Sequence, residues 1–182
     1  MSEAFDTALA ICGGVAAVGN GLVFLAAGVA KLRNRRVFPG VVANYRLLPD
    51  ALVGPVATVL PWAEVLIGAA LLGGTAFAAV PAAGLLLAFA VAMAVNIGRG
   101  RAHIDCGCGR SELRQPLSRT LVARNVVLAA LLVPALMGLP AFGSLAWGLS
   151  LAGGLALYLM TLLVNALAAL AAGPLAVERN SR

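Results

Sequence analysis

Five long stretches of this chain carry almost no charged side chains, and they leave very few folds open to it. They lie at about residues 8–30, 50–73, 76–97, 120–138 and, for the most part, 144–172. Each is about 19–25 residues or longer, the length that lets a helix cross a hydrocarbon core of about 30 Å. In lipid the backbone must satisfy its own hydrogen bonds, as it does in a helix. We therefore predict an all-α fold, an integral membrane bundle of about five transmembrane helices that forms a single domain over residues 1–182.

The composition argues against the other fold classes. The chain is 62% hydrophobic and 11% charged, whereas a soluble domain is roughly 45–50% apolar and about 25% charged, so a water-facing globule would expose large apolar patches. Aromatic residues make up 5% of the chain, too few for the aromatic girdles of a membrane β-barrel. The abundant Ala and Gly suit helices that pack closely in lipid.

The connections between the apolar stretches are short. Residues 37–48 mix apolar and polar side chains and are expected to lie along the membrane surface as an amphipathic segment. Residues 73–75 (Gly-Gly-Thr) predict a tight turn, and residues 98–119 form a polar loop. Because Glu3 and Asp6 make the N-terminus acidic, we predict no cleavable signal peptide, which would open with positive charge.

The basic residues predict which end of the bundle faces the cytoplasm. With five helices, all 13 Lys and Arg fall on one side, in the loop after the first helix, around the loop after the third, and in the C-terminal tail. By the positive-inside rule we expect a bacterial inner-membrane protein with its N-terminus outside and the 98–119 loop and C-terminus in the cytoplasm. The formal charge of +6 would suggest nucleic acid only for a soluble domain, so the lipid bilayer is the expected partner.

Two cysteines in the loop after the third helix are the strongest candidates for chemistry. Cys106 and Cys108 flank Gly107, and because two residues reach at most about 7 Å, a disulfide between them needs a tight turn that glycine permits. A strained disulfide is labile, which suits thiol exchange better than structural cross-linking. Protonated His103 would favour the thiolate form and Asp105 would oppose it, so both are candidates for tuning the thiols.

Other interpretations of these cysteines stay open. The two thiols could be incidental and reduced. A metal could use His103 and Asp105 as well, but the one-residue gap between the cysteines fits structural zinc poorly and there is no second cluster, so we predict no metal site. Cys12 lies near the opposite end of the first helix, where we expect it to act as a packing residue.

Glu64 is the only acidic residue well inside a predicted helix. An ionisable group at this depth costs at least about 2–3 kcal/mol and usually faces the bundle interior with a partner. The candidate partners are Asn20, Asn96 and Asn165. Glu64 is then either part of a proton or ligand site, or a polar lock between helices, and both stay open.

The order of these motifs resembles a known family. The residues that carry the likeness are 28–32 (Gly-Val-Ala-Lys-Leu), Phe38, 45–49 (Tyr-Arg-Leu-Leu-Pro), 61–64 (Pro-Trp-Ala-Glu) with Gly68, and 105–109 (Asp-Cys-Gly-Cys-Gly). All but the last set resemble the first- and second-helix signatures of the DoxX-like membrane proteins. The last set resembles the methylamine utilisation protein MauE branch. The resemblance implies a four-helix DoxX-like core with one further helix.

The resemblance also implies a function. MauE-like proteins are associated with maturing the exported, disulfide-rich small (β) subunit of methylamine dehydrogenase, together with a thioredoxin-like partner, MauD. Cys106 and Cys108 would then be the redox pair of a thiol–disulfide oxidoreductase component, and Glu64 would be its in-membrane acid. Besides the cysteines themselves, a quinone is the candidate cofactor.

The expected orientation places the thiol pair in the cytoplasm, whereas this client folds outside. Three resolutions stay open: a conduit across the membrane through Cys12 or a quinone, a re-entrant loop, or a redox-sensing role for the thiols. Two other functions also stay open. One is a non-enzymatic scaffold that uses small-residue helix faces, and the other is a small transporter or quinone-binding protein that uses Glu64.

Overall fold

The computed structural model describes residues 2–107, 116–141 and 144–171. In chain order the elements are α1 (Ser2–Arg33), α2 (Phe38–Asn44), α3 (Asp50–Leu72), the 3-10 turn η1 (Ala76–Ala78), α4 (Ala79–Gly98), α5 (Arg119–Leu131), α6 (Val133–Met137) and α7 (Leu145–Ala171).

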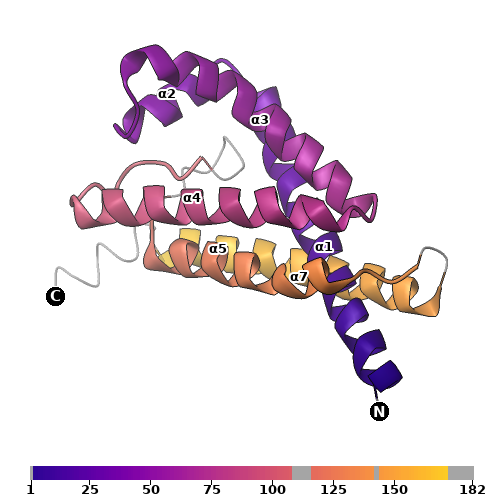
Figure 1. The fold of residues 1–182 in the computed structure, drawn as a ribbon. Coiled ribbons are helices and arrows are strands. Elements are labelled where there is room, and N and C mark those ends of the chain that lie inside the picture. The colour runs from indigo at the N-terminus through magenta and orange to yellow at the C-terminus, as the bar shows by residue number, and fades with distance from the viewer. Residues whose placement is uncertain (1, 108–115, 142–143, 172–182) are drawn as a thin grey trace, which may run out of the picture.

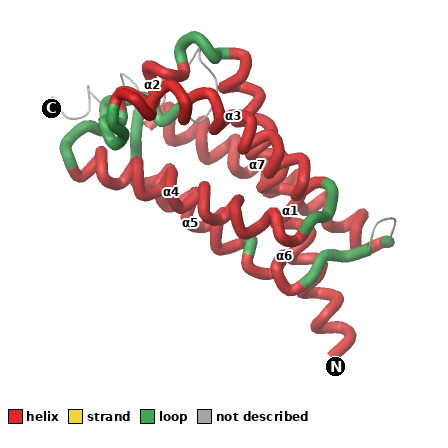
Figure 2. Tube along the Cα trace, turned by 45° about the horizontal axis from the view of Figure 1, so that its top comes forward, coloured by secondary structure: helices red, strands yellow, loops and turns green. Residues whose placement is uncertain are grey.

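The predicted all-α membrane bundle is confirmed. Within the described residues, five helical segments are long and apolar enough to cross a membrane: Glu3–Arg33, Asp50–Leu72, Ala76–Gly98, Arg119–Met137 and Leu145–Leu170. The same part of the chain contains no strand, and its single β-type pairing is an isolated bridge between Asp105 and Pro116. Figure 2 shows helices joined by short loops.

Helix α1 is the centre of the bundle. It packs along α3 and along α7, and α6 lies against its N-terminal half. Figure 1 shows α1 crossing the direction of α4, α5 and α7 obliquely. Helices α4 and α5 pack side by side, and the main hydrophobic core lies where α1, α4 and α5 meet, around Phe24, Leu86 and Leu128.

Glycines allow the close approach of α1 to its neighbours. A Cβ added to Gly28 would stand 2.8 Å from the carbonyl oxygen of Pro61, and one added to Gly68 would stand 2.8 Å from that of Gly21. A Cβ on Gly154 of α7 would meet the Val18 side chain at 2.5 Å. The small-residue helix faces noted in the sequence are therefore used to pack α1 against α3 and α7 of the same chain.

Several element boundaries differ from the sequence prediction. Helix α1 is longer than the predicted residues 8–30, and it ends at Arg33. The predicted helix at 120–138 is divided into α5 and α6, because Pro134 near the start of α6 lacks the N–H that would continue the ladder. The predicted turn at 73–75 is confirmed, with Gly74 at a φ of 75°. The predicted end of the last helix, at about residue 172, lies outside the described residues.

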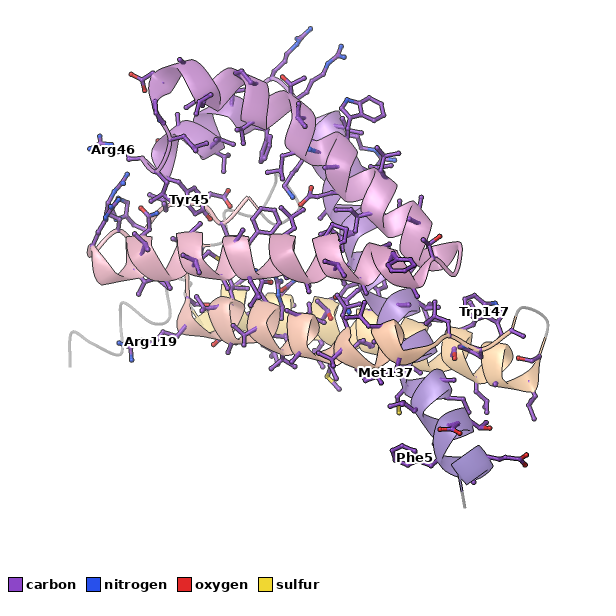
Figure 3. All side chains as sticks on the ribbon, viewed as in Figure 1. Phe5, Tyr45, Arg46, Arg119, Met137 and Trp147 are labelled. Carbon is purple, nitrogen blue, oxygen red and sulfur yellow. The ribbon has the colours of Figure 1, made fainter. Side chains whose placement is uncertain are left out.

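The loops after α1 and after α4 meet at one end of the bundle, as the five-helix prediction requires. Arg101 donates hydrogen bonds to the carbonyl oxygens of Asn44 (2.6 Å) and Tyr45 (3.5 Å) at the end of α2. In Figure 3, Tyr45, Arg46 and Arg119 lie toward one end, while Phe5, Met137 and Trp147 lie toward the other. We refer to the end with Arg46 and Arg119 as the basic end.

The glycine contacts make a stability prediction. Gly28→Ala should lower the free energy of unfolding by about 1–3 kcal/mol, because its Cβ forces α1 away from the backbone of α3. The matched control is Gly84→Ala on α4, where an added Cβ meets nothing within 4 Å. Thermal unfolding of the purified proteins in detergent would compare them, and equal melting temperatures would contradict the close packing of α1 on α3.

Candidate functional site

A buried ion pair joins α1 to α3. The Nζ atom of Lys31 lies 2.6 Å from Oε1 and 2.7 Å from Oε2 of Glu64, and the two side chains are 7% and 1% exposed. The close contact of Gly28 with Pro61 and Val65 brings the helices together one turn away from this pair. Because a buried charge is costly unless it is paired and hydrogen-bonded, the ion pair fixes how α1 and α3 sit against each other.

The structure corrects the expected partners of Glu64. The amides of Asn20 and Asn96 donate instead to backbone carbonyls one turn earlier, at 3.0 Å each, and Asn165 accepts a hydrogen bond from Arg124. The partner is Lys31, which the sequence analysis counted only as a loop cation. Helix α1 continues past Lys31, and the long lysine side chain reaches back into the bundle.

Two aromatic rings also lie close to the ammonium group of Lys31. Lys31 Nζ lies 5.7 Å from the ring centroid of Phe38 at the start of α2 and 5.5 Å from that of Phe89 on α4. Both distances fall within the range of cation–π attraction. Lys31 thus contacts α2, α3 and α4 at once, and it holds these three elements around one charge.

The cysteine loop folds back onto the transmembrane helices. Cys106 is 9% exposed and belongs to a cluster with Met93 of α4 and Leu121 of α5. The Tyr45 hydroxyl donates a hydrogen bond of 3.0 Å to the carbonyl oxygen of Cys106. The first thiol of the predicted pair therefore lies against the bundle, and Cys108 lies outside the described residues.

The other loop residues have distinct positions. The N–H of Gly107 donates to Oδ1 of Asp105 at 3.0 Å, so the carboxylate of Asp105 closes a short Asx-type turn around Cys106. Gly107 has a φ of 67°, the left-handed conformation expected of a glycine in a tight turn. His103 is exposed, and Cys12 is exposed near α6, at the end of the bundle opposite Cys106. The structure therefore brings Asp105 close to Cys106 and keeps Cys12 far from it.

A large cavity of about 700 Å³ lies beside the ion pair, between α1, α4, α5 and α7. Lys31 and Glu64 line it, together with Arg124, Asn125 and Asn165. Arg124 donates to Oδ1 of Asn125 at 2.8 Å and to Oδ1 of Asn165, so it connects α5 to α7 across this cavity. From the sequence, Arg124 is only one of the basic residues that predict which end of the bundle faces the cytoplasm.

A small cavity of about 300 Å³ lies on the other side of Lys31, between α2, α3, α4 and the cysteine loop. Lys31 and Phe89 line both cavities, while Tyr45, Cys106 and Gly107 line the small one. The remaining walls are mostly apolar. Lys31 therefore stands between a cavity with several charged and amide side chains in its wall and a smaller, apolar cavity that Cys106 lines. Of the residues that line the two cavities, the sequence points to Glu64, Asn165, Cys106 and Gly107 as candidates for a site, and to Lys31, Phe38 and Tyr45 only through the family resemblance.

Groups of three or more His, Cys, Asp or Glu side chains that could hold a metal do not occur among the described residues. Because Cys108 lies outside them, the metal alternative for the cysteine loop is untested.

The ion pair predicts a double-mutant result. Lys31→Met should lower the free energy of unfolding by about 3–5 kcal/mol, because it leaves the carboxylate of Glu64 buried without its cation. The double variant Lys31→Met/Glu64→Met should be more stable than either single variant, since no unpaired charge then remains. Thermal unfolding of all four proteins in detergent gives the coupling, and additive losses would contradict a direct interaction.

The comparisons identify the family. The family model described as methylamine utilisation protein MauE matches residues 9–139. A methylamine utilization protein MauE of Paracoccus denitrificans is 51% identical over 122 residues, which cover 66% of this chain and 66% of the relative. The proteins of the same name from Methylophilus methylotrophus and Methylorubrum extorquens are 49% and 41% identical over 60% and 72% of this chain, covering 57% and 66% of the relatives.

The chain thus spans less than two thirds of the length of these relatives. No solved structure matches it significantly. The match to the family model covers most of α1 and all of α2 to α6, and it includes Lys31, Glu64 and Cys106. The chain therefore belongs to the methylamine utilisation protein MauE family.

Proposed function

We propose that this chain is a membrane component of thiol–disulfide exchange that supports the maturation of an exported, disulfide-bearing protein in methylamine utilisation. The proposed client is the small (β) subunit of methylamine dehydrogenase, and the proposed partner is a thioredoxin-like, MauD-type protein. The observation that carries the proposal is the position of Cys106, held by Tyr45 against transmembrane helices at the wall of a cavity.

The chemistry is an exchange between two pairs of sulfur atoms. A thiolate of the reduced thioredoxin-like partner, on the same side of the membrane as Cys106, attacks the disulfide of Cys106 and Cys108 and forms a mixed disulfide. The second thiol of the attacking protein resolves it. The attacking pair ends as a disulfide, Cys106 and Cys108 end as thiols, and two electrons have moved to this chain.

The surroundings of Cys106 support a redox role better than an incidental one. The Asp105–Gly107 turn and the Tyr45 hydroxyl fix the backbone on either side of the sulfur. Such a fixed, small-loop thiol can be kept in the geometry needed to pair with a cysteine two residues away. An incidental thiol would not require this support from another helix.

A second candidate function is transport or binding of a polar ligand in the large cavity, favoured by the Lys31–Glu64 pair and Arg124 in its wall. This function predicts that Glu64→Gln abolishes activity while the cysteines are dispensable. The scaffold alternative has weaker support, because Gly28 and Gly68 pack α1 against α3 within the chain.

The cysteine prediction separates these functions. In cells that mature the client, Cys106→Ser/Cys108→Ser should lower the yield of client with complete disulfides about tenfold or more, since no exchange is possible without the sulfur pair. Cys12→Ser is the matched control and should have no effect. Client disulfides are counted by mass spectrometry after thiol alkylation, and complete disulfides in the double variant would disprove the thiol role.

The proposal includes the orientation given by the charges, with the basic end in the cytoplasm and the N-terminus outside the inner membrane of a bacterial cell. In a variant without native cysteines, Ala4→Cys should react with a membrane-impermeant maleimide in spheroplasts, whereas Asn44→Cys should react only after permeabilisation. Both positions are exposed, and they neighbour Phe5 and Tyr45, which lie toward opposite ends of the bundle (Figure 3). The reverse pattern would place Cys106 on the side where the client folds.

A further inference from the structure

The small cavity has the shape and lining of a site for a flat, mostly apolar molecule. At about 300 Å³, it is at the lower end of the range of about 300–1,000 Å³ for small-molecule sites. Its walls come from three elements, with Val41 from α2, Leu60 from α3, and Phe89 and Ala92 from α4. The volume suits a ring system of one or two fused rings.

The cavity mouth is apolar as well. Leu47 and Leu48, in the connection between α2 and α3, line the cavity and are 39% and 36% exposed. Ala88 on the facing surface of α4 is also exposed. This apolar mouth lies beside the start of α3, one of the helices long and apolar enough to cross a membrane, so it offers a lipophilic ligand an apolar path into the cavity.

One buried hydrogen-bond donor remains for a ligand. The ammonium group of Lys31 has three N–H bonds, and two of them go to the oxygens of Glu64. No other acceptor for Lys31 occurs among the residues that the structure describes. Because Lys31 lines the cavity, its third N–H can donate to a carbonyl oxygen of a molecule bound there.

Cys106 lines the same cavity as Lys31. A lipid acyl chain would fill apolar space but would use neither the ammonium group nor the sulfur. A lipophilic quinone uses all three features, since it has an apolar ring, carbonyl oxygens that accept hydrogen bonds, and the ability to take two electrons from a dithiol.

We propose that the cavity between α2, α3 and α4 binds the ring of a lipophilic quinone, which accepts the electrons that Cys106 receives. This inference rests on the proposed function, and it names the terminal oxidant. The thiols of Cys106 and Cys108 lose two S–H bonds and gain one S–S bond. The quinone gains two O–H bonds and becomes a quinol, so two electrons and two protons are transferred. Lys31 stabilises the negative charge that develops on the quinone oxygen.

Binding is tested first without electron transfer. The Cys106→Ser/Cys108→Ser protein, purified in detergent, is titrated with decylubiquinone, and the bound fraction is measured by equilibrium dialysis. We expect saturable binding that Ala92→Phe weakens about tenfold or more by filling the ring site. Ala94→Phe is the matched control, because Ala94 is exposed on the same helix and lines neither cavity. Equal binding in the two variants, or no saturable binding, would overturn the quinone site.

A second pair of variants tests the same cavity independently, in case Ala92→Phe does not fold. Leu48→Trp enlarges a side chain that lines the cavity and so takes up part of its volume, whereas Leu52→Trp enlarges an exposed leucine that does not line it. We expect only Leu48→Trp to weaken binding, with both proteins retaining the wild-type melting temperature. Weaker binding in neither variant, or in both to the same extent, would contradict binding of the quinone in this cavity.

Electron transfer is tested on the fully reduced wild-type protein. With decylubiquinone, one quinol should form for each pair of thiols lost, and Ala92→Phe should slow this reaction while Ala94→Phe does not. Bound quinone that never oxidises the thiols would overturn the proposal. If quinone neither binds nor oxidises the thiols but the cysteine variants still impair the client, only the quinone site is wrong. If quinone oxidises the thiols but the cysteine variants leave the client complete, only the proposed function is wrong.

Discussion

The buried ion pair between Lys31 and Glu64 determines how the helices at the basic end of the bundle are arranged. Two ions inside a membrane protein are tolerated when each satisfies the other and the remaining donors find partners. Glu64 is 1% exposed, so its cation must come from within the fold, and Lys31 on α1 supplies it. Phe38 and Phe89 then gather around the ammonium group, which sets the positions of α2 and α4.

The same arrangement of helices also explains why cavities lie at the basic end of the bundle. Glycine contacts hold α3 tightly to α1, whereas α3 and α4 touch only weakly. Helix α2 fills part of the gap, and Lys31 bridges the rest with a long side chain instead of a packed helix face. The small cavity lies in this gap, and the large cavity lies on the other side of Lys31, between α1, α4, α5 and α7.

The helices could be predicted from sequence because hydropathy and length determine which segments cross a membrane. The break between α5 and α6 depends on Pro134. In the sequence this proline is one residue inside a long apolar stretch, so the hydropathy pattern alone does not predict the break. The partner of Glu64 could not be predicted, because Lys31 sits among loop arginines and its inward direction depends on where α1 ends. The folding of the Cys106 loop onto α4 and α5 depends on Tyr45 and Arg101, whose contacts span 61 and 57 residues.

Hydrogen bonds join the cysteine loop to the end of α2 as well as to Asn96 of α4. Arg101 holds the last carbonyls of α2, and Tyr45 holds the backbone of Cys106. The loop is therefore mechanically coupled to the α2–α3 hairpin, although it follows α4 in sequence. A shift of that hairpin would move the sulfur of Cys106 and reshape the small cavity in the same step, so occupancy of the cavity and reactivity of the thiol would vary together.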